Sequence, residues 1–246
     1  STLKNRRYNY RFAFVPETIG SIAYISKNLE LLKRDLIAGF NITCIGDERC
    51  YSYLPSRHGN TISDKIAKHV LKHIDSQYKS YSWTDRGSDE RQYSSPGFRI
   101  PVATVTKDKY YEYPQYHTSL DDLTLVNGAH LIESLTIYED AIRILDSNRI
   151  VVSKYPKGEV QLGSRGLYPT VGGKIGQSLA GANKKVDQEK LVDLISWVMF
   201  LADGTCDLVS ISERSGHDFK SVNACIDVLS GHELVEVLPM EQHGSA

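Results

Sequence analysis

The chain has 246 residues, of which 41% are hydrophobic and 24% are charged, and its formal net charge is −1 at pH 7. This length suits one large domain or a main domain with a small appendage, and the proportions are those of a globular protein. No apolar run approaches the length that crosses a bilayer, and residues 1–11 lack the apolar core of a secretory leader. The four cysteines are scattered without C-x-x-C spacing, which favours a reduced compartment. We therefore expect a cytoplasmic protein without a membrane partner.

Strand and helix patterns alternate in the first part of the chain. Residues 8–15 alternate between polar and apolar side chains and then become apolar, which predicts a strand that enters the middle of a sheet. Apolar residues at steps of three and four over 19–32 predict a helix, and 39–47 are typical of the next strand. A strand, a helix and a strand within this length favour a right-handed parallel crossover.

The same alternation continues to about residue 150. A second helix is predicted to open at Thr61 and to run to residue 74, because a hydroxyl residue precedes the apolar period. Residues 100–105 predict a third buried strand, and 128–145 predict a long amphipathic helix. These elements indicate an α/β domain over residues 1–150 with a three-layer α/β/α architecture.

The rest of the chain differs in composition. Residues 151–185 are rich in glycine without a sustained period, which indicates a linker or an extended arm, and 186–246 resume an apolar pattern. The predicted helices cover 191–201, 208–215 and 219–229, and a strand covers 234–238. This order resembles a small winged helix-turn-helix domain.

The predicted winged-helix domain is acidic. From Lys185 onward the chain has four lysines and arginines against eleven aspartates and glutamates. Such a balance is poorly suited to binding phosphates, which disfavours nucleic acid as a partner and favours a protein contact. We expect this domain to serve protein contacts, including those of a homo-oligomer.

Three residues are candidates for a metal site. His117 is followed by hydroxyl residues and then by two aspartates within 116–122, which suits a metal ligand whose ring is held by a neighbouring acceptor. Glu17 and Asp47 each follow a predicted buried strand, where ligands gather in open α/β sheets. Two plainer readings stay open, because Glu17 also suits a helix N-terminus and Asp47 also suits a turn.

Several motifs together resemble a known superfamily. They are Phe14–Ser21, Gly46–Asp47, Gly87–Glu90, Ile100–Val102 and Tyr116–Thr118. Their order is similar to that of the di-zinc aminopeptidase and carboxypeptidase superfamily, and most similar to a bacterial aminopeptidase-like branch with a C-terminal winged helix, associated with surface polysaccharide loci. The resemblance spans about residues 8–238.

The resemblance implies a zinc-dependent hydrolase that cleaves a peptide or amide bond. It assigns His117, Glu17 and Asp47 as ligands of one or two zinc ions, with Glu17 as either ligand or catalytic base. The superfamily's early histidine and bridging aspartate have no counterpart in this chain. Zinc lowers the pKa of bound water to about 7, and a carboxylate then removes the proton.

The implied substrate is a small peptide-like or aminoacyl molecule. Asp89, Glu90, Arg91 and Tyr116 are the predicted substrate-binding residues, and a tyrosine of this loop suits an oxyanion donor. Two alternatives remain: a non-catalytic remnant or scaffold, motivated by the missing ligands, and a winged-helix regulator with a ligand-sensing domain.

Overall fold

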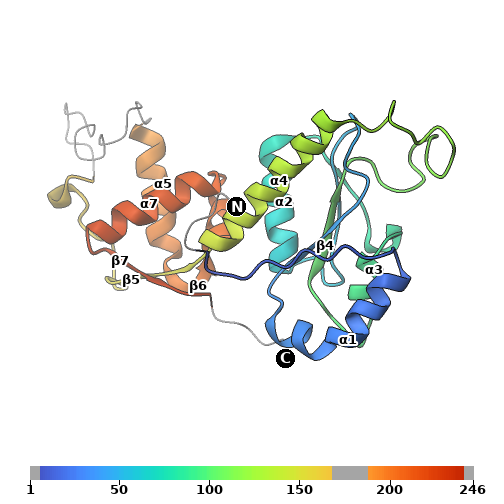
Figure 1. Ribbon diagram of the computed structural model, residues 1–246. Coiled ribbons are helices and arrows are strands. Elements are labelled where there is room, and N and C mark those ends of the chain that lie inside the picture. The colour runs from blue at the N-terminus through green and yellow to red at the C-terminus, as the bar shows by residue number, and fades with distance from the viewer. Residues whose placement is uncertain (1–5, 168–187, 241–246) are drawn as a thin grey trace. The chain divides into compact units, whose positions relative to one another are not determined.

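The computed structural model describes residues 6–167 and 188–240, which form two compact units, one up to Asp146 and one from Ser147 onward (Figure 1). Helices and strands alternate in the first unit. They are α1 Ile19–Asp35, β1 Gly39–Ile42, β2 Ser52–Leu54, α2 Ile62–Ile74, β3 Lys79–Ser80, the 3₁₀ turn Trp83–Asp85, α3 Glu90–Tyr93, β4 Val102–Thr106 and α4 Gly128–Ser147. The predicted α/β class is confirmed.

The sheet of the first unit has four strands in the order β1-β4-β2-β3. Strand β4 runs parallel to β1 and antiparallel to β2, and all five of its residues are buried. Because side chains alternate along a strand, Val102 points to one face, where it packs with Ile25 of α1. The opposite face carries Phe40, whose ring contacts Tyr138 of α4 at a centroid distance of 6.1 Å. Helices therefore cover both faces, and β4 lies between α1 and α4 (Figure 1).

Residues 8–15 do not form the strand that their alternation predicts. They are neither helix nor strand, and the chain is exposed from Arg11 to Phe14. The segment is attached through side chains instead, because Asp146 accepts hydrogen bonds from the Arg7 N–H at 3.0 Å and the Tyr10 hydroxyl at 2.7 Å. With no strand from this segment in the sheet, the predicted strand-helix-strand crossover through α1 is also absent.

Helix α2 begins as predicted at Thr61. The Thr61 side chain and the Asp64 carboxylate form a reciprocal capping box, which satisfies backbone N–H groups at the helix start. Asp64 is fully buried and also accepts from the Tyr53 hydroxyl at 2.6 Å and from the Ser56 N–H at 2.8 Å. These hydrogen bonds outweigh the effect of burial and lower the pKa of Asp64.

The second unit has the helices and strands of a winged helix-turn-helix. Its elements are β5 Ile150–Ser153, the 3₁₀ turn Gly163–Arg165, α5 Gln188–Leu201, β6 Asp203–Asp207, α6 Leu208–Ser215, α7 Phe219–Gly231 and β7 Val235–Leu238. The three strands form an antiparallel sheet in the order β6-β5-β7. Asp207 and Asp218 cap α6 and α7, and Gly216 ends α6 in the left-handed conformation at φ 76°.

The second unit begins earlier than the sequence analysis places it. Strand β5 lies in the segment read as a linker, yet it is the central strand of this sheet. The remainder of that segment, from 168 to 185, lies outside the described residues. In the part of the chain that the structure describes, no helix combines the length and the apolar character needed to cross a membrane.

Candidate functional site

Glu17 precedes Thr18, the N-cap residue of α1, in a turn held by Asp89 and Arg91 at the start of α3. Glu17 is exposed, and the next residue, Thr18, has φ 62°. The Thr18 N–H donates to the Asp89 carboxylate at 2.7 Å, and Arg91 donates to the Thr18 hydroxyl at 2.9 Å. In this structure Asp89 and Arg91 thus position the turn that carries Glu17, and their predicted contact with a substrate stays a prediction.

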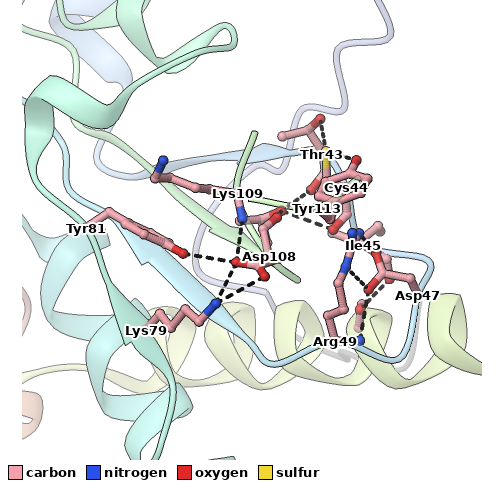
Figure 2. A network of polar contacts seen from close by, with 12 residues as sticks. Thr43, Cys44, Ile45, Asp47, Arg49, Lys79, Tyr81, Asp108, Lys109 and Tyr113 are labelled. Atoms are coloured by element: carbon pink, nitrogen blue, oxygen red, sulfur yellow. Dashed lines mark hydrogen bonds and ion pairs between the residues drawn. The ribbon is translucent and has the colours of Figure 1, made fainter. Parts of the chain in front are cut away.

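Asp47 follows β1 and is ion-paired. Its side chain is almost fully buried, at 2% exposure, and Arg49 binds both carboxylate oxygens, at 2.8 and 2.5 Å. The Arg49 guanidinium carbon lies 3.3 Å from the ring centroid of Tyr113. Figure 2 shows this pair beside Tyr113 and Cys44. Asp47 and Arg49 are only two residues apart, so the ion pair is local in sequence. It is not among the predicted contacts.

Cys44 lies in the same loop in a left-handed conformation, with φ 49°. Its carbonyl oxygen accepts from the Thr106 hydroxyl at 3.0 Å and from the Lys107 N–H at 2.9 Å, which ties the loop to the end of β4. The Tyr113 hydroxyl donates to its sulfur at 3.8 Å. Burial raises the pKa of the Tyr113 hydroxyl, and the electrostatic interaction and hydrogen bond with Cys44 raise it further.

A second polar network adjoins this loop (Figure 2). The buried Asp108 carboxylate is bound by Lys79 at 3.1 Å and by the Tyr81 hydroxyl at 2.9 Å. Burial and then the hydrogen bond to Asp108 raise the pKa of Tyr81, which therefore stays a donor at neutral pH. This network attaches the loop after β4 to β3.

Glu90 is the first residue of α3 and is fully buried, with 0% exposure. One carboxylate oxygen accepts from the N–H groups of Gly87 at 2.8 Å and Ser88 at 3.0 Å. The other accepts from the Asn41 amide at 2.9 Å and the Tyr110 hydroxyl at 3.4 Å. Glu90 therefore joins three segments of the chain, and its predicted role in substrate binding stays a prediction.

The tyrosine-rich loop places Tyr116 and His117 side by side. Their rings stack at a centroid distance of 4.0 Å and an interplanar angle of 15°, and Tyr111 contacts both rings. His117 is exposed and has φ 55°. Burial raises the pKa of Tyr116, Tyr111 and the charge of Glu17 raise it further, and Arg91 lowers it. A tyrosine hydroxyl is already protonated at neutral pH, and the raised pKa makes the Tyr116 hydroxyl still harder to ionise.

Backbone strain is concentrated around the candidate ligands. Of the six non-glycine residues with positive φ in the described part of the chain, four lie in this region: Thr18, Cys44, Tyr111 and His117. Each such residue costs about 1–3 kcal/mol and persists only where surrounding contacts enforce it, and such residues cluster at functional sites. No pattern in the sequence analysis indicates this strain.

The candidate ligands are not gathered into a metal site in this structure. Across residues 6–167 and 188–240, no three His, Cys, Asp or Glu side chains form a group that could hold one metal ion. Asp47 is bound to Arg49, and His117 is stacked on Tyr116. The donor types suit zinc, but the three residues alone do not fit a zinc site as they stand.

Two family profiles match the chain. The profile of a domain of unknown function (DUF4910) matches residues 1–148, and a winged helix-turn-helix profile matches 149–237. Their boundary falls within two residues of the division between the two units, at 146 and 147.

Proteins of Clostridium acetobutylicum are similar in both sequence and structure. One, described as a candidate polysaccharide biosynthesis protein with an aminopeptidase-like domain, is 36% identical over 238 residues, which are 97% of this chain and 52% of the relative. A crystal structure of a candidate peptidase shows a TM-score of 0.78 and 33% identity over 95% of this chain and 49% of that one. An aminopeptidase from an Aneurinibacillus strain gives a TM-score of 0.42 at 17% identity, over 52% of this chain and 30% of its own. The chain thus spans about half the length of the relatives that it matches.

Proposed function

Since the chain belongs to the family of the domain of unknown function DUF4910, we propose that its first unit supplies part of the active site of an aminopeptidase-like hydrolase. The observation that carries this proposal is the strain at Thr18, Cys44, Tyr111 and His117, which lie next to or among the candidate ligands. The similarity to a candidate peptidase supports the same reaction class.

The proposed site uses zinc held in part by Glu17, Asp47 and His117. Because these residues alone do not form a metal site, the proposal requires further groups from outside the described residues. In this structure the Asp47 carboxylate is bound by Arg49, so Asp47 would hold zinc only with that ion pair open. When bound, zinc would activate water for attack on a peptide or amide bond. Glu17 is then either a ligand or the base that accepts the proton.

The substrate we propose is a small peptide-like or aminoacyl molecule. The Tyr116 hydroxyl, which like any tyrosine hydroxyl is protonated at neutral pH, suits an oxyanion donor beside His117. Asp89 and Arg91 act by holding the turn of Glu17, and the buried Glu90 holds Gly87 and Ser88 through their N–H groups. A link to surface polysaccharide metabolism follows from the description of the Clostridium relative alone.

The first experiment measures zinc affinity by competition with a chelating dye for the wild type, His117→Ala and His58→Ala. His58 is an exposed histidine of the first unit with no proposed role, so it serves as the matched control. We expect His117→Ala to weaken zinc binding by more than about tenfold and His58→Ala to leave it unchanged. Equal affinities in all three proteins would refute the assignment of His117.

A second candidate function is a non-catalytic binding protein or scaffold. It is favoured by the ion pair that already binds Asp47 and by the lack of a three-ligand group among the described residues. Metal-dependent release of an amino acid from a short peptide, lost in Glu17→Ala, would exclude this alternative.

The winged-helix unit is proposed to serve protein contacts, including a homo-oligomer, in the cytoplasm. Helix α7 exposes Lys220 but also Asp227, and Asp218 caps its start. This mixed surface in an acidic segment disfavours nucleic acid. A shift of duplex DNA at physiological salt would instead support the third reading, a winged-helix regulator.

A further inference from the structure

The second unit has a pocket between its last helix and the strands next to it. Helix α7 packs against β7, and β7 pairs with β5 (Figure 1). The pocket has a volume of about 620 Å³, which is typical of small-molecule sites. Its lining residues belong to α7, to β7 and to the residues on either side of β5, so the whole pocket lies within the second unit.

Four of the lining residues are charged, and their charges cancel. Arg149 and Lys154 are basic, whereas Asp227 and Glu236 are acidic. A ligand with a net charge would leave one sign of the pocket unpaired. A small molecule that carries one positive and one negative group can pair with both signs. The pocket is therefore complementary to a zwitterion.

Arg149 has a donor that the described residues do not use. Its Nη2 atom donates to the Asn223 amide oxygen at 2.7 Å and lies 3.8 Å from the Asp227 carboxylate. The second distance is too long for a direct hydrogen bond, so Asp227 keeps its acceptor oxygens for another donor. The Nε atom of Arg149 is buried and has no hydrogen-bond partner among the described residues. A guanidinium has five N–H donors in a fixed fork, and this one lacks an acceptor.

Ser230 supplies a second unpaired donor to the same pocket. It lies three residues after Asp227 on α7, so the two side chains are neighbours on the helix surface. Its hydroxyl is buried and, within the described part of the chain, also lacks a partner. Buried polar groups nearly always have a partner, so these two donors indicate an acceptor that the described residues do not supply. A carboxylate has two oxygens and can accept from both donors.

The rest of the pocket suits an ammonium group and an apolar side chain. The Asp227 side chain is 67% exposed and Glu236 is exposed, so both carboxylates are accessible to a ligand. Val235 and Val237 also line the pocket, and they share one face of β7 because side chains alternate along a strand. An apolar side chain of the ligand would be removed from water against these two valines.

We propose that this pocket binds a free α-amino acid with an apolar side chain. Its carboxylate accepts hydrogen bonds from Arg149 Nε and from the Ser230 hydroxyl. Its ammonium group donates to Asp227 and Glu236, and its side chain packs on the two valines. A free amino acid is also what an aminopeptidase-like reaction releases, and this link alone rests on the proposed function.

Isothermal titration calorimetry of the intact chain with L-leucine tests this assignment. EDTA is present throughout, so that no zinc-dependent complex in the first unit contributes to the heat. We expect saturable binding of leucine at a single site. 4-Methylpentanoate lacks the ammonium group, L-leucinamide lacks the carboxylate and glycine lacks the apolar side chain, so each should bind at least about tenfold more weakly.

Two pairs of variants locate the site. Asp227→Asn removes a charge that pairs with the ammonium group, and Glu233→Gln makes the same change at an exposed acid that does not line the pocket. Ser230→Ala removes the unpaired hydroxyl, and Ser196→Ala removes an exposed hydroxyl on α5. We expect the two pocket variants to weaken leucine binding by about tenfold and the two controls to leave it unchanged. None of the four residues belongs to the buried core, so each variant should fold, which circular dichroism checks.

Several results would overturn the inference. Leucine that shows no saturable binding is one, and binding of 4-methylpentanoate, leucinamide or glycine as tight as that of leucine is another. Wild-type affinity in Asp227→Asn and Ser230→Ala, or an equal loss in their controls, would show that leucine does not bind in this pocket. Binding abolished by Glu17→Ala but unchanged in Ser230→Ala would place the leucine site in the first unit instead.

The outcome is separable from that of the proposed function. Leucine binding as expected, in a chain whose zinc affinity is unchanged by His117→Ala, would support the pocket and refute the assigned metal site. Zinc affinity lost in His117→Ala, with no leucine binding to the wild type, would refute the pocket alone.

Discussion

Removing the buried Glu90 carboxylate tests whether its hydrogen bonds stabilise the first unit at the candidate site. In Glu90→Ala the N–H groups of Gly87 and Ser88 lose their acceptor inside the protein. Each buried donor left without a partner costs about 1–3 kcal/mol, so the two together cost about 2–6 kcal/mol. Asn41 and Tyr110 lose a partner as well, and the deleted side chain leaves a cavity, which adds to the loss.

Glu90→Gln is the matched comparison. Its carbonyl oxygen can still accept from Gly87 and Ser88, while its amide group replaces the oxygen that faces Asn41 and Tyr110. The Asn41 amide and the Tyr110 hydroxyl can both reorient to accept, so we expect a cost of only about 1–2 kcal/mol. Glu90→Ala should therefore be less stable than Glu90→Gln by at least about 1 kcal/mol.

Urea unfolding measures this difference. The chain has two tryptophans, Trp83 in the first unit and Trp197 in the second, so a Trp197→Phe background lets fluorescence report the first unit alone. A lower midpoint at an unchanged slope gives the loss of stability. Equal midpoints for the alanine and glutamine variants would show that water or rearrangement satisfies the Gly87 and Ser88 donors, and would refute the reasoning.

Three further predictions concern the same unit. Arg49→Met leaves the buried Asp47 charge unpaired and should lower the free energy of unfolding by about 3–5 kcal/mol, measured by urea unfolding with Arg49→Lys as the milder control. Gly87→Ala places a Cβ 2.4 Å from a Tyr110 ring carbon, so the ring must move; we expect a loss of about 1–3 kcal/mol and an altered near-ultraviolet circular dichroism spectrum. Asp64 has a lowered pKa when folded, so its stabilising effect is present above the unfolded pKa of about 3.9 and disappears as the pH falls through the folded value. In Asp64→Asn this acid-side decrease in the urea midpoint should be smaller than in the wild type.

Each of these has a result that would contradict it. Arg49→Met with wild-type stability would mean that Asp47 does not depend on the ion pair. An unchanged spectrum and midpoint in Gly87→Ala would show that the loop accommodates the methyl group without moving Tyr110. An acid-side slope in Asp64→Asn equal to that of the wild type would assign the pH dependence to other carboxyl groups.

Local patterns predicted most of the fold. Helices α1, α2, α4, α6 and α7 lie where three- and four-residue spacing predicts them, because each buries one face against its own unit. Thr61 was identified as a helix start for a reason that the structure confirms, since capping depends on residues three apart. The strand β5 was missed because a short strand next to a glycine-rich segment has too few residues to show a period.

The site was less predictable because its contacts join distant segments. Asp89 and Thr18 are 71 residues apart, and Asn41 and Glu90 are 49 apart, so neither pair has a local sequence signal. Left-handed backbone at a threonine or histidine is likewise enforced by tertiary contacts rather than by the residue itself. The Asp47–Arg49 pair is the exception, because two residues of opposite charge only two positions apart can be predicted to pair from the sequence.

The wrong strand over residues 8–15 and the exposure of Phe14 have a common physical explanation. Alternation in residues 8–15 is a property of the sequence, but a strand exists only when its backbone groups have a partner. Phe14 is exposed in that segment, whereas alternation would place it on a buried face of an extended sheet. No strand among the described residues pairs with this segment, so its alternation leaves Phe14 exposed rather than buried.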